Sequence, residues 1–589
     1  MIAGAVVLVL AALGLALRRP AAQPSGSAAP TPTKATPTAV AAPAAQAATP
    51  TVAADPEAAA DAPAEPAPPD AAAFFDDRRF TYEPGFYSPQ IQAFLETQPG
   101  PLKGMSFMVG DRRHSFAEVI VGRTSYSSIN PKVILALLES QSRLLSTAKP
   151  SSDQIGWAIG FQGESGRWRG LTAQMRWAVR QMVESKVDYP QYLPLTYADG
   201  SSAPPPPGMS MSAYAIARAL APTTSAARLP ALMQRFLETY TQLFGDPRIA
   251  PEGWPAPAAP FLARPTEQVM PVTSFFDHDA PALIKNGTLV TYWGRDEQDI
   301  AFAYDGHDGW DYAAAPPDLA LAAGDGDVVF AGNADDNCAT RAVIIDHRNG
   351  YRTLYWHLDR VDVEIGQQIT RGQPVGMIGS SGCANGPHLH FGVQFLGRNT
   401  DPYGWCGATP DPWQSHPAGS TSVWLWADRP SPCDAPPPGA LVVDTDSPGF
   451  AREGDGWQAN PVGYGGGSLF VPSMRGIDAA GPPGLRPLAR PAVAVWRPDL
   501  PAAGRYRVLA YVPYALSGLE DATHVRYRVR YSGGEAETVV SIPDYANDWV
   551  DLGTYDFDPS DRPTVSLSNI AEVDGRSIWA DAVIWLPVP

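Results

Sequence analysis

Histidines are scarce in this chain of 589 residues, and four of the nine lie in three short motifs. GHDGWDY carries His307 and Asp311, YWHL carries His357, and GPHLHF carries His388 and His390. Around them lie short segments rich in β-branched residues with Gly and Asn turns, such as GDVVFAG, RAVIIDHRNGYRTLYWHL and PVGMIGSSG. A domain that unites these motifs is therefore predicted to be antiparallel and all-β, with a hairpin at Arg348-Asn349-Gly350.

The histidine motifs have the donor types of a zinc site. Side chains alternate between the two faces of a strand, so His388 and His390 point to the same side. The HxxxD motif adds the imidazole of His307 and the carboxylate of Asp311. A catalytic zinc uses three protein ligands and leaves a fourth position for water. Each motif alone also suits ordinary surface or core histidines, but the combination favours a metal site, and spacing does not decide which histidine of the pair binds.

The segment from about Tyr304 to Val393 resembles the lysostaphin or LytM type of peptidoglycan endopeptidase. The motifs DGHDGWDY, AAGDGDVVFAG, LYWHL, ITRGQPVGMIGSSG and NGPHLHFGV follow one another in the order of that family. The resemblance implies a duplicated hybrid motif β-fold and a secreted zinc metalloendopeptidase. Its expected substrate is the stem or cross-bridge peptide of bacterial peptidoglycan.

The resemblance also assigns a role to each residue of the motifs. It makes His307, Asp311 and His390 the zinc ligands, and His357 and His388 the catalytic histidines that do not bind the metal. Zinc lowers the pKa of a bound water from about 15.7 to about 7. His388 is then expected to take the proton of that water and pass it to the leaving amine, while His357 stabilises the developing charge or orients the water.

The chain is too long for a single core and is predicted to contain several domains. We expect an α-helical domain, then the antiparallel all-β peptidase, then a β-sandwich accessory module. The predicted segments are 1–17 as a signal or membrane anchor, 18–73 as a disordered Ala/Pro/Thr linker, 74–264 as the helical domain, 265–433 as the zinc metallopeptidase domain, 434–440 as a second linker and 441–589 as the accessory module.

The N-terminal sequence and the cysteines both indicate an extracytoplasmic protein. Residues 2–17 are apolar throughout and have the length of a signal-peptide core, although Arg18 and Arg19 follow the run. Cleavage of a signal and a single N-terminal membrane anchor therefore both stay open. The four cysteines fit no thiolate zinc site, and the least entangled disulfides join Cys338 to Cys383 and Cys406 to Cys433. Four free thiols are the alternative.

The predicted helical domain is centred on a helical stripe in Pro131–Ser146, with Ser128 and Asn130 as cap residues. NPKVILALLESQSRLL resembles the active-site helix of lysozyme-like lytic transglycosylases. Gln141 stands in the slot of the catalytic glutamate, and a glutamine cannot protonate a glycosidic oxygen. We expect a lysozyme-like domain that binds glycan without cleaving it, and an unrelated helical bundle is the alternative.

The C-terminal 441–589 segment alternates apolar and polar residues in strands such as AGRYRVLAYVPY and HVRYRVRYSGG. With VVDTDSPGF, WVDLGTYDF and WADAVIWL it resembles the golvesin or xanthan-lyase C-terminal type of module. That resemblance implies a non-catalytic accessory domain with carbohydrate as an expected ligand. Trp457 and Trp549 would either stack on sugar rings or pack in the core.

The net charge of -18 excludes a protein that binds nucleic acid through a basic stripe. It also argues against non-specific adhesion to anionic polymers. Two other functions stay open beside the wall endopeptidase. One is a non-catalytic scaffold that binds the wall or regulates other hydrolases, and the other is a secreted protease that cuts Gly-rich proteins with the same machinery.

Overall fold

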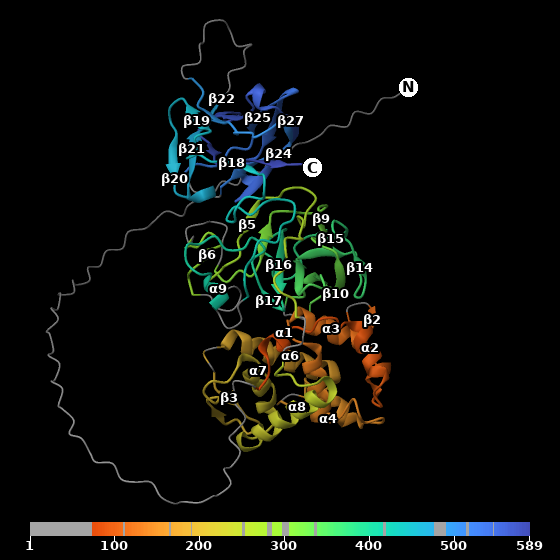
Figure 1. The fold of residues 1–589 in the computed structure, drawn as a ribbon. Helices are drawn as coiled ribbons and strands as arrows, with labels where there is room; N and C mark the ends of the chain where they lie inside the picture. Colours follow the sequence, from red (N-terminus) through yellow and green to blue (C-terminus); the bar gives the residue numbers. More distant parts are fainter. Residues whose placement is uncertain are drawn as a thin grey trace, which may run out of the picture. The chain divides into compact units, whose positions relative to one another are not determined.

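The computed structural model describes residues 74–588 apart from several short segments (Figure 1). The predicted signal or anchor and the predicted 18–73 linker lie outside the described residues. Among the residues that are described, no helix has both the length and the apolar character that a membrane crossing requires. The segments left out within this range are 110–111, 164–165, 190, 192, 250–253, 280–285, 297–304, 335–337, 416–419, 476–489, 514–516 and 546.

The first part of the described chain is mainly helical, as predicted for residues 74–264, and it also contains two short hairpins that the prediction lacked. Its core is built from buried aliphatic and aromatic side chains of α3, α4, α7 and α8. The elements are α1 (Asp77–Thr81), α2 (Ser88–Glu96), β1 (Ser106–Val109), β2 (Arg112–Ser115), α3 (Phe116–Tyr126), α4 (Pro131–Ser142), α5 (Ser152–Gly156), α6 (Leu171–Asp188), β3 (Leu195–Thr196), β4 (Ser202–Ala203), α7 (Met211–Leu220) and α8 (Leu229–Phe244).

Helix α4 begins as predicted but ends earlier than its apolar stripe. The Asn130 side chain caps it by accepting the backbone N–H of Lys132 at 2.8 Å. At the other end Arg143 adopts a left-handed conformation with φ of 56°, which stops the helix. The Glu139 carboxylate accepts the backbone N–H groups of the turn that follows, at 2.8 Å from Leu145. Glu139 therefore has a structural role at the end of this helix.

The middle part of the chain is an antiparallel, all-β domain, as predicted. An eight-stranded sheet has the order β14-β10-β11-β12-β16-β8-β5 with β17 beside β16, and a second sheet has the order β13-β15-β9. The strands are β5 (Val272–Ser274), β8 (Trp310–Tyr312), β9 (Leu319–Leu321), β10 (Gly326–Asn333), β11 (Arg341–Asp346), β12 (Tyr351–Trp356), β13 (Leu358–Val361), β14 (Gln368–Ile369), β15 (Pro374–Ile378), β16 (Leu389–Phe395) and β17 (Arg398–Asn399); β6 (Val290–Thr291) and β7 (Arg295–Asp296) form a separate hairpin, and α9 (Pro412–Ser415) follows.

Two local predictions for this domain are confirmed. Strands β11 and β12 pair as an antiparallel hairpin, and Gly350 takes the positive φ of 87° that its turn requires. The disulfides join Cys338 to Cys383 and Cys406 to Cys433. These bridges rule out the alternative of four free thiols.

The C-terminal part is built of β-sheets, as predicted for a sandwich, with one parallel pair among antiparallel strands. A four-stranded sheet has the order β18-β31-β24-β27, and a five-stranded sheet has the order β19-β23-β28-β25-β26. The strands are β18 (Leu441–Val443), β19 (Phe450–Glu453), β20 (Gln458–Asn460), β21 (Ser468–Pro472), β22 (Met474–Arg475), β23 (Val493–Trp496), β24 (Gly504–Val512), β25 (Val525–Tyr531), β26 (Gly534–Val540), β27 (Asp548–Phe557), β28 (Thr564–Ser568), β29 (Ile570–Ala571), β30 (Ser577–Ala580) and β31 (Val583–Pro587).

The suggested sugar-stacking role is wrong for Trp549. Its side chain is buried, packs against Tyr511, and donates its indole N–H to the carbonyl oxygen of Pro430 at 3.0 Å. Trp457 is half-buried and donates its indole N–H to the Glu453 carbonyl oxygen at 3.1 Å. The alternative of core packing therefore holds for Trp549.

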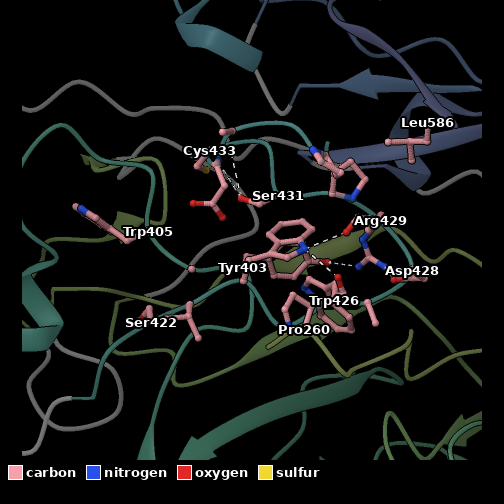
Figure 2. Close-up of a pocket in the computed structure, with 18 of the residues that line it drawn as sticks. Pro260, Tyr403, Trp405, Ser422, Trp426, Asp428, Arg429, Ser431, Cys433 and Leu586 are labelled. Carbon is pink, nitrogen blue, oxygen red and sulfur yellow. Dashed lines mark hydrogen bonds and ion pairs between the residues drawn. The ribbon is translucent and has the colours of Figure 1, made fainter. Parts of the chain in front are cut away.

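The tryptophan-bearing connection before the C-terminal part folds back onto the peptidase sheets and lines a pocket of about 560 Å³ (Figure 2). Trp426 forms a β-bridge with Leu262, and the Trp424 indole donates to the Arg429 carbonyl oxygen at 3.1 Å. The Arg429 guanidinium is buried and contacts the Asp548 carboxylate at 2.8 Å. A buried ion pair thus links this connection to β27.

Candidate active site

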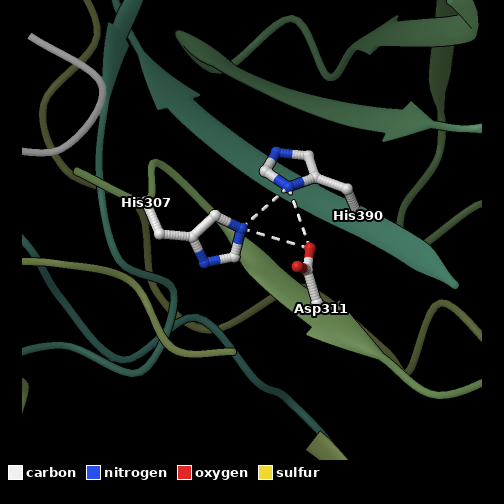
Figure 3. A group of neighbouring side chains, drawn as sticks. All are labelled: His307, Asp311 and His390. Atoms are coloured by element: carbon white, nitrogen blue, oxygen red, sulfur yellow. Dashed lines mark hydrogen bonds and ion pairs between the residues drawn. The ribbon is translucent and has the colours of Figure 1, made fainter. Parts of the chain in front are cut away.

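Three side chains of the predicted zinc site converge in the peptidase domain (Figure 3). Asp311 lies on β8 and His390 lies directly opposite it on β16. His307 reaches them from the loop that precedes β8. His307 Nε2 lies 3.1 Å from Asp311 Oδ1 and 3.0 Å from His390 Nδ1, and the last two atoms are 3.0 Å apart.

The loop that carries His307 needs glycine where it passes the other side chains. A Cβ atom at Gly309 would lie 2.8 Å from the His390 ring. Gly306 has a φ of 78°, a left-handed conformation that other residues seldom adopt. The glycines of GHDGWDY therefore allow a loop and a strand to bring their donor atoms together.

The segment after β5 holds the His307 loop in place. The Phe275 carbonyl oxygen accepts the Nδ1–H of His307 at 2.7 Å, which turns Nε2 toward Asp311 and His390. The Asp277 carboxylate accepts the N–H of Gly306 at 2.8 Å, and the Asp277 N–H donates to the His307 carbonyl oxygen at 2.8 Å. Sequence reasoning missed Asp277, because a lone aspartate about thirty residues upstream of the motif carries no pattern of its own.

The electrostatics of this cluster suit a cation. Burial by itself would raise the pKa of Asp311, but the neighbouring imidazoles of His307 and His390 hold it well below the usual range. Burial by itself would lower the pKa of His390. The hydrogen bond and the charge of the Asp311 carboxylate outweigh the effect of burial, so this pKa is raised. All three side chains are buried. Tetrahedral zinc with ligands at about 2.0–2.2 Å would separate its donors by about 3.3 Å, so the observed spacing fits the metal after a small expansion.

The two other predicted histidines lie beside this cluster. The rings of His357 and His388 have centroids 4.6 Å apart. His388 Nδ1 donates to the Gly386 carbonyl oxygen at 2.9 Å, and its Nε2 lies 3.8 Å from Asp311 Oδ1. His357 Nδ1 donates to the Ser381 carbonyl oxygen at 2.8 Å. The structure thus gathers all five residues of the motifs, while their roles stay predictions.

Burial and the neighbouring imidazoles keep His357 neutral. Burial lowers its pKa to about 4, and the nearby His390 and His388 act in the same direction, against the hydrogen bond to the Ser381 carbonyl oxygen. Because Nδ1 carries the proton that Ser381 accepts, Nε2 of His357 is a hydrogen-bond acceptor.

An aromatic stack that the sequence analysis did not identify supports the site. Trp356 lies opposite His390 in the β12–β16 register, and the two rings stack with centroids 4.8 Å apart. Tyr126 of α3 stacks with Trp356 at 5.6 Å. Trp356 lies within the motif YWHL and so gave a local signal, but its partner on α3 lies more than two hundred residues away.

Comparisons with known families agree with the resemblances seen in the sequence for the peptidase and for the C-terminal part. Residues 305–402 match the model of Peptidase family M23. Residues 73–257 match the model named LasA, N-terminal domain, and residues 486–585 match the Golvesin C-terminal domain. The likeness of the helical region to lysozyme stays a prediction.

The regions that match individual relatives cover only part of this chain and only part of each relative. Peptidoglycan DD-endopeptidase ShyA of Vibrio cholerae is 39% identical over 92 residues, 16% of this chain and 21% of that protein. DD-carboxypeptidase/endopeptidase Mpg of Neisseria meningitidis is 35% identical over 105 residues, 18% of this chain and 24% of that protein. The chain thus spans less than a quarter of the length of either relative. A crystal structure of a zinc containing peptidase from Vibrio cholerae is similar with 27% identity and a TM-score of 0.18, over 24% of this chain and 37% of that one.

Proposed function

Since residues 305–402 form a domain of peptidase family M23, we propose that this protein is a zinc metalloendopeptidase of bacterial peptidoglycan. It would hydrolyse peptide bonds in the stem or cross-bridge peptides of the wall, outside the cytoplasm. The names of ShyA and Mpg, both endopeptidases, support that substrate class. The observation that carries the proposal is the buried cluster of His307, Asp311 and His390, with two more histidines at its edge.

In this proposal His307 Nε2, an Asp311 carboxylate oxygen and His390 Nδ1 hold the metal. Bound zinc would lower the pKa of a water at its fourth position and polarise the scissile carbonyl. The carbonyl oxygen of Phe275 keeps the proton of His307 on Nδ1, away from the metal. Asp308 Oδ1 lies 3.7 Å from Nε2 of His390, the nitrogen that would not bind the metal, and would help to hold the orientation of that ring.

His388 is the proposed general base. Its Nδ1 donates to Gly386, so its Nε2 is free to accept a proton, and it lies beside the proposed ligands. That proton would then pass to the nitrogen of the leaving amine as the peptide bond breaks. His388 is partly exposed, with 18% of its side chain accessible, so that substrate can reach it.

His357 is proposed to orient the attacking water. Its Nε2 is an acceptor, because Nδ1 donates to the Ser381 carbonyl oxygen. An acceptor can hold the water's hydrogen atom, whereas stabilising an oxyanion would require a donor. Of the two roles that the sequence analysis left open, this hydrogen bond favours orientation of the water.

The regions on either side of the peptidase are proposed to hold the protein on the wall. In the predicted likeness to the lytic transglycosylases, Gln141 in α4 stands in the slot of their general acid, so glycan binding without cleavage is the role proposed for the helical region. The non-catalytic scaffold is less well supported, because it predicts loss of ligands or catalytic histidines and all five residues are present.

The test is release of new amino groups from purified peptidoglycan by zinc-loaded protein. We expect His390→Ala to lose both zinc and activity, and His388→Ala to keep zinc but lose activity by at least about a hundredfold. His524→Ala, an exposed histidine of the C-terminal part, is the matched control and should behave as wild type. A wild-type protein that binds zinc and releases no amino groups would refute the proposal in favour of the scaffold. Cleavage of an elastin-like peptide but not of wall would favour the secreted protease.

A further inference from the structure

A cleft of about 860 Å³ is lined by α3, α6, β10 and β13, outside the five-residue cluster. Its lining is unusually rich in arginine for a chain with a net charge of -18. Six arginines line the cleft; five of them are exposed, and Arg123 is half-buried. The six are Arg112, Arg123, Arg176, Arg180, Arg341 and Arg360.

Two acidic neighbours of these arginines are held in exposed ion pairs; the cleft is also lined by Asp359 and by Glu118, whose carboxylate accepts the backbone N–H of Ser115 at 2.6 Å. Arg112 contacts Glu364 at 3.2 Å with more than half of both side chains accessible, and Arg180 contacts Glu184 at 2.8 Å. Exposed pairs of this kind contribute little net free energy, so an incoming carboxylate can exchange with the glutamates. Guanidinium groups bind carboxylates through paired N–H donors, which makes this lining suited to an anionic ligand.

The cleft shares its wall with the proposed catalytic site. Tyr126 lines it and stacks on Trp356, whose other neighbour is the ring of His390. Arg341 also lines it, and its backbone N–H donates to Ser381 Oγ at 3.0 Å. The stacked rings of Tyr126 and Trp356 therefore connect the wall of the cleft to His390.

We propose that this cleft binds the free carboxylates of an acidic wall peptide on one side of the bond that is cut. The inference rests on the proposed function and adds a substrate feature to it, namely a peptide with unmodified side-chain or α-carboxylates. The apolar lining would contact the aliphatic parts of the same peptide. The apolar lining of the cleft includes Val119, Val183, Phe330, Val361 and Ile365.

The experiment compares two soluble stem-peptide dimers that differ only in whether their carboxylates are free or amidated. The cleft variant is Arg112→Gln with Arg176→Gln and Arg360→Gln. Its matched control, Arg235→Gln with Arg452→Gln and Arg530→Gln, removes the same charge at exposed positions outside the cleft. We expect the cleft variant to raise KM for the free-carboxylate dimer about tenfold. The control variant should leave KM unchanged, and neither variant should change KM for the amidated dimer.

An equal KM effect of the cleft variant on both dimers, or an equal effect of the control variant, would overturn the inference. Binding of a single free-carboxylate stem peptide to the zinc-loaded protein, measured by calorimetry, separates this result from failure of the proposed function. If wild type cuts neither dimer but binds the free-carboxylate peptide about tenfold more tightly than its amidated form, the cleft stands and the peptidase does not. If wild type cuts wall but does not distinguish the two peptides, the cleft inference fails alone.

Discussion

The buried histidine that no motif marked, His278, shows how single residues shape this domain. Its two ring nitrogens lie 3.0 Å from carboxylate oxygens of Asp401 and Asp411. Asp401 also accepts the indole N–H of Trp310, the residue before Asp311, at 2.9 Å. Through these hydrogen bonds, His278, Asp401 and Asp411 connect segments near both ends of the peptidase domain to β8, the strand that carries Asp311.

The charge of His278 makes the stability of the fold depend on pH. Burial alone would lower its pKa, but the hydrogen bonds and charges of Asp401 and Asp411 outweigh burial and raise it to about 9. Because this value exceeds the ordinary 6.5, the protonated ring stabilises the fold fully below about pH 6.5. That stabilisation, up to about 3 kcal/mol, is lost as the pH rises through about 9.

Urea unfolding of wild type and His278→Gln, followed between pH 6 and pH 10, tests this expectation. The difference in unfolding free energy between the two proteins should shrink across that range. Lys186 of α6, whose pKa burial lowers to about 8, titrates in the same window in both proteins and cancels in the difference. A difference that stays constant from pH 6 to pH 10 would show that His278 is neutral in the fold.

At the residue scale the sequence identified the chemistry of the site but not its supports. His307, Asp311, His357, His388 and His390 could be named because each lies in a compact motif with known neighbours. Asp277, His278 and Tyr126 act through contacts with residues distant in the sequence. Such contacts leave no periodic or spaced pattern in one sequence.

At the scale of elements, a loop tied by a disulfide forms one edge of the site. The bridge between Cys338 and Cys383 closes a sequence separation of 45 residues. It joins the segment that precedes β11 to the loop after β15, where the Ser381 carbonyl oxygen fixes the tautomer of His357. The second bridge, between Cys406 and Cys433, closes a sequence separation of 27 residues. Among the contacts of the described residues, none joins this bridge to any of the five motif residues.

The two disulfides therefore give a matched pair of variants. Replacing Cys338 and Cys383 by serine should cost up to about 4 kcal/mol of stability, and replacing Cys406 and Cys433 should cost nearly as much. Only the first change should lower kcat on wall peptide, by about tenfold to a hundredfold, because it frees the partner of His357. Thermal unfolding and kcat would be measured on both double variants. Equal kcat values would show that the bridge does not position Ser381.

Elements were predictable where the local pattern agreed with the fold. The β11–β12 hairpin followed from Asn349-Gly350, and α4 began at its Asn130 cap. The end of α4 was not predictable from its apolar stripe, because Arg143 takes a left-handed conformation that the Glu139 carboxylate supports from across the turn. The small hairpins of the helical region are too short to produce an alternating pattern.

At the scale of the whole molecule, the order of helical, peptidase and accessory regions could be predicted from changes in pattern along the chain. The exact segment boundaries stay predictions. The sequence did not reveal how the C-terminal part joins the peptidase. Asp548 lies between the guanidinium groups of Arg264 and Arg429, at 2.9 Å and 2.8 Å, and its own sequence context carries no signal of that contact.

The proposed peptidase activity depends on a catalytic zinc ion held by His307, Asp311 and His390. Anomalous X-ray scattering at the zinc edge, from crystals of the full-length zinc-loaded protein, tests this most directly. We expect one strong peak about 2.0–2.2 Å from His307 Nε2, an Asp311 carboxylate oxygen and His390 Nδ1. A peak bound by His357 or His388 instead, or zinc only at other sites in an active protein, would contradict it.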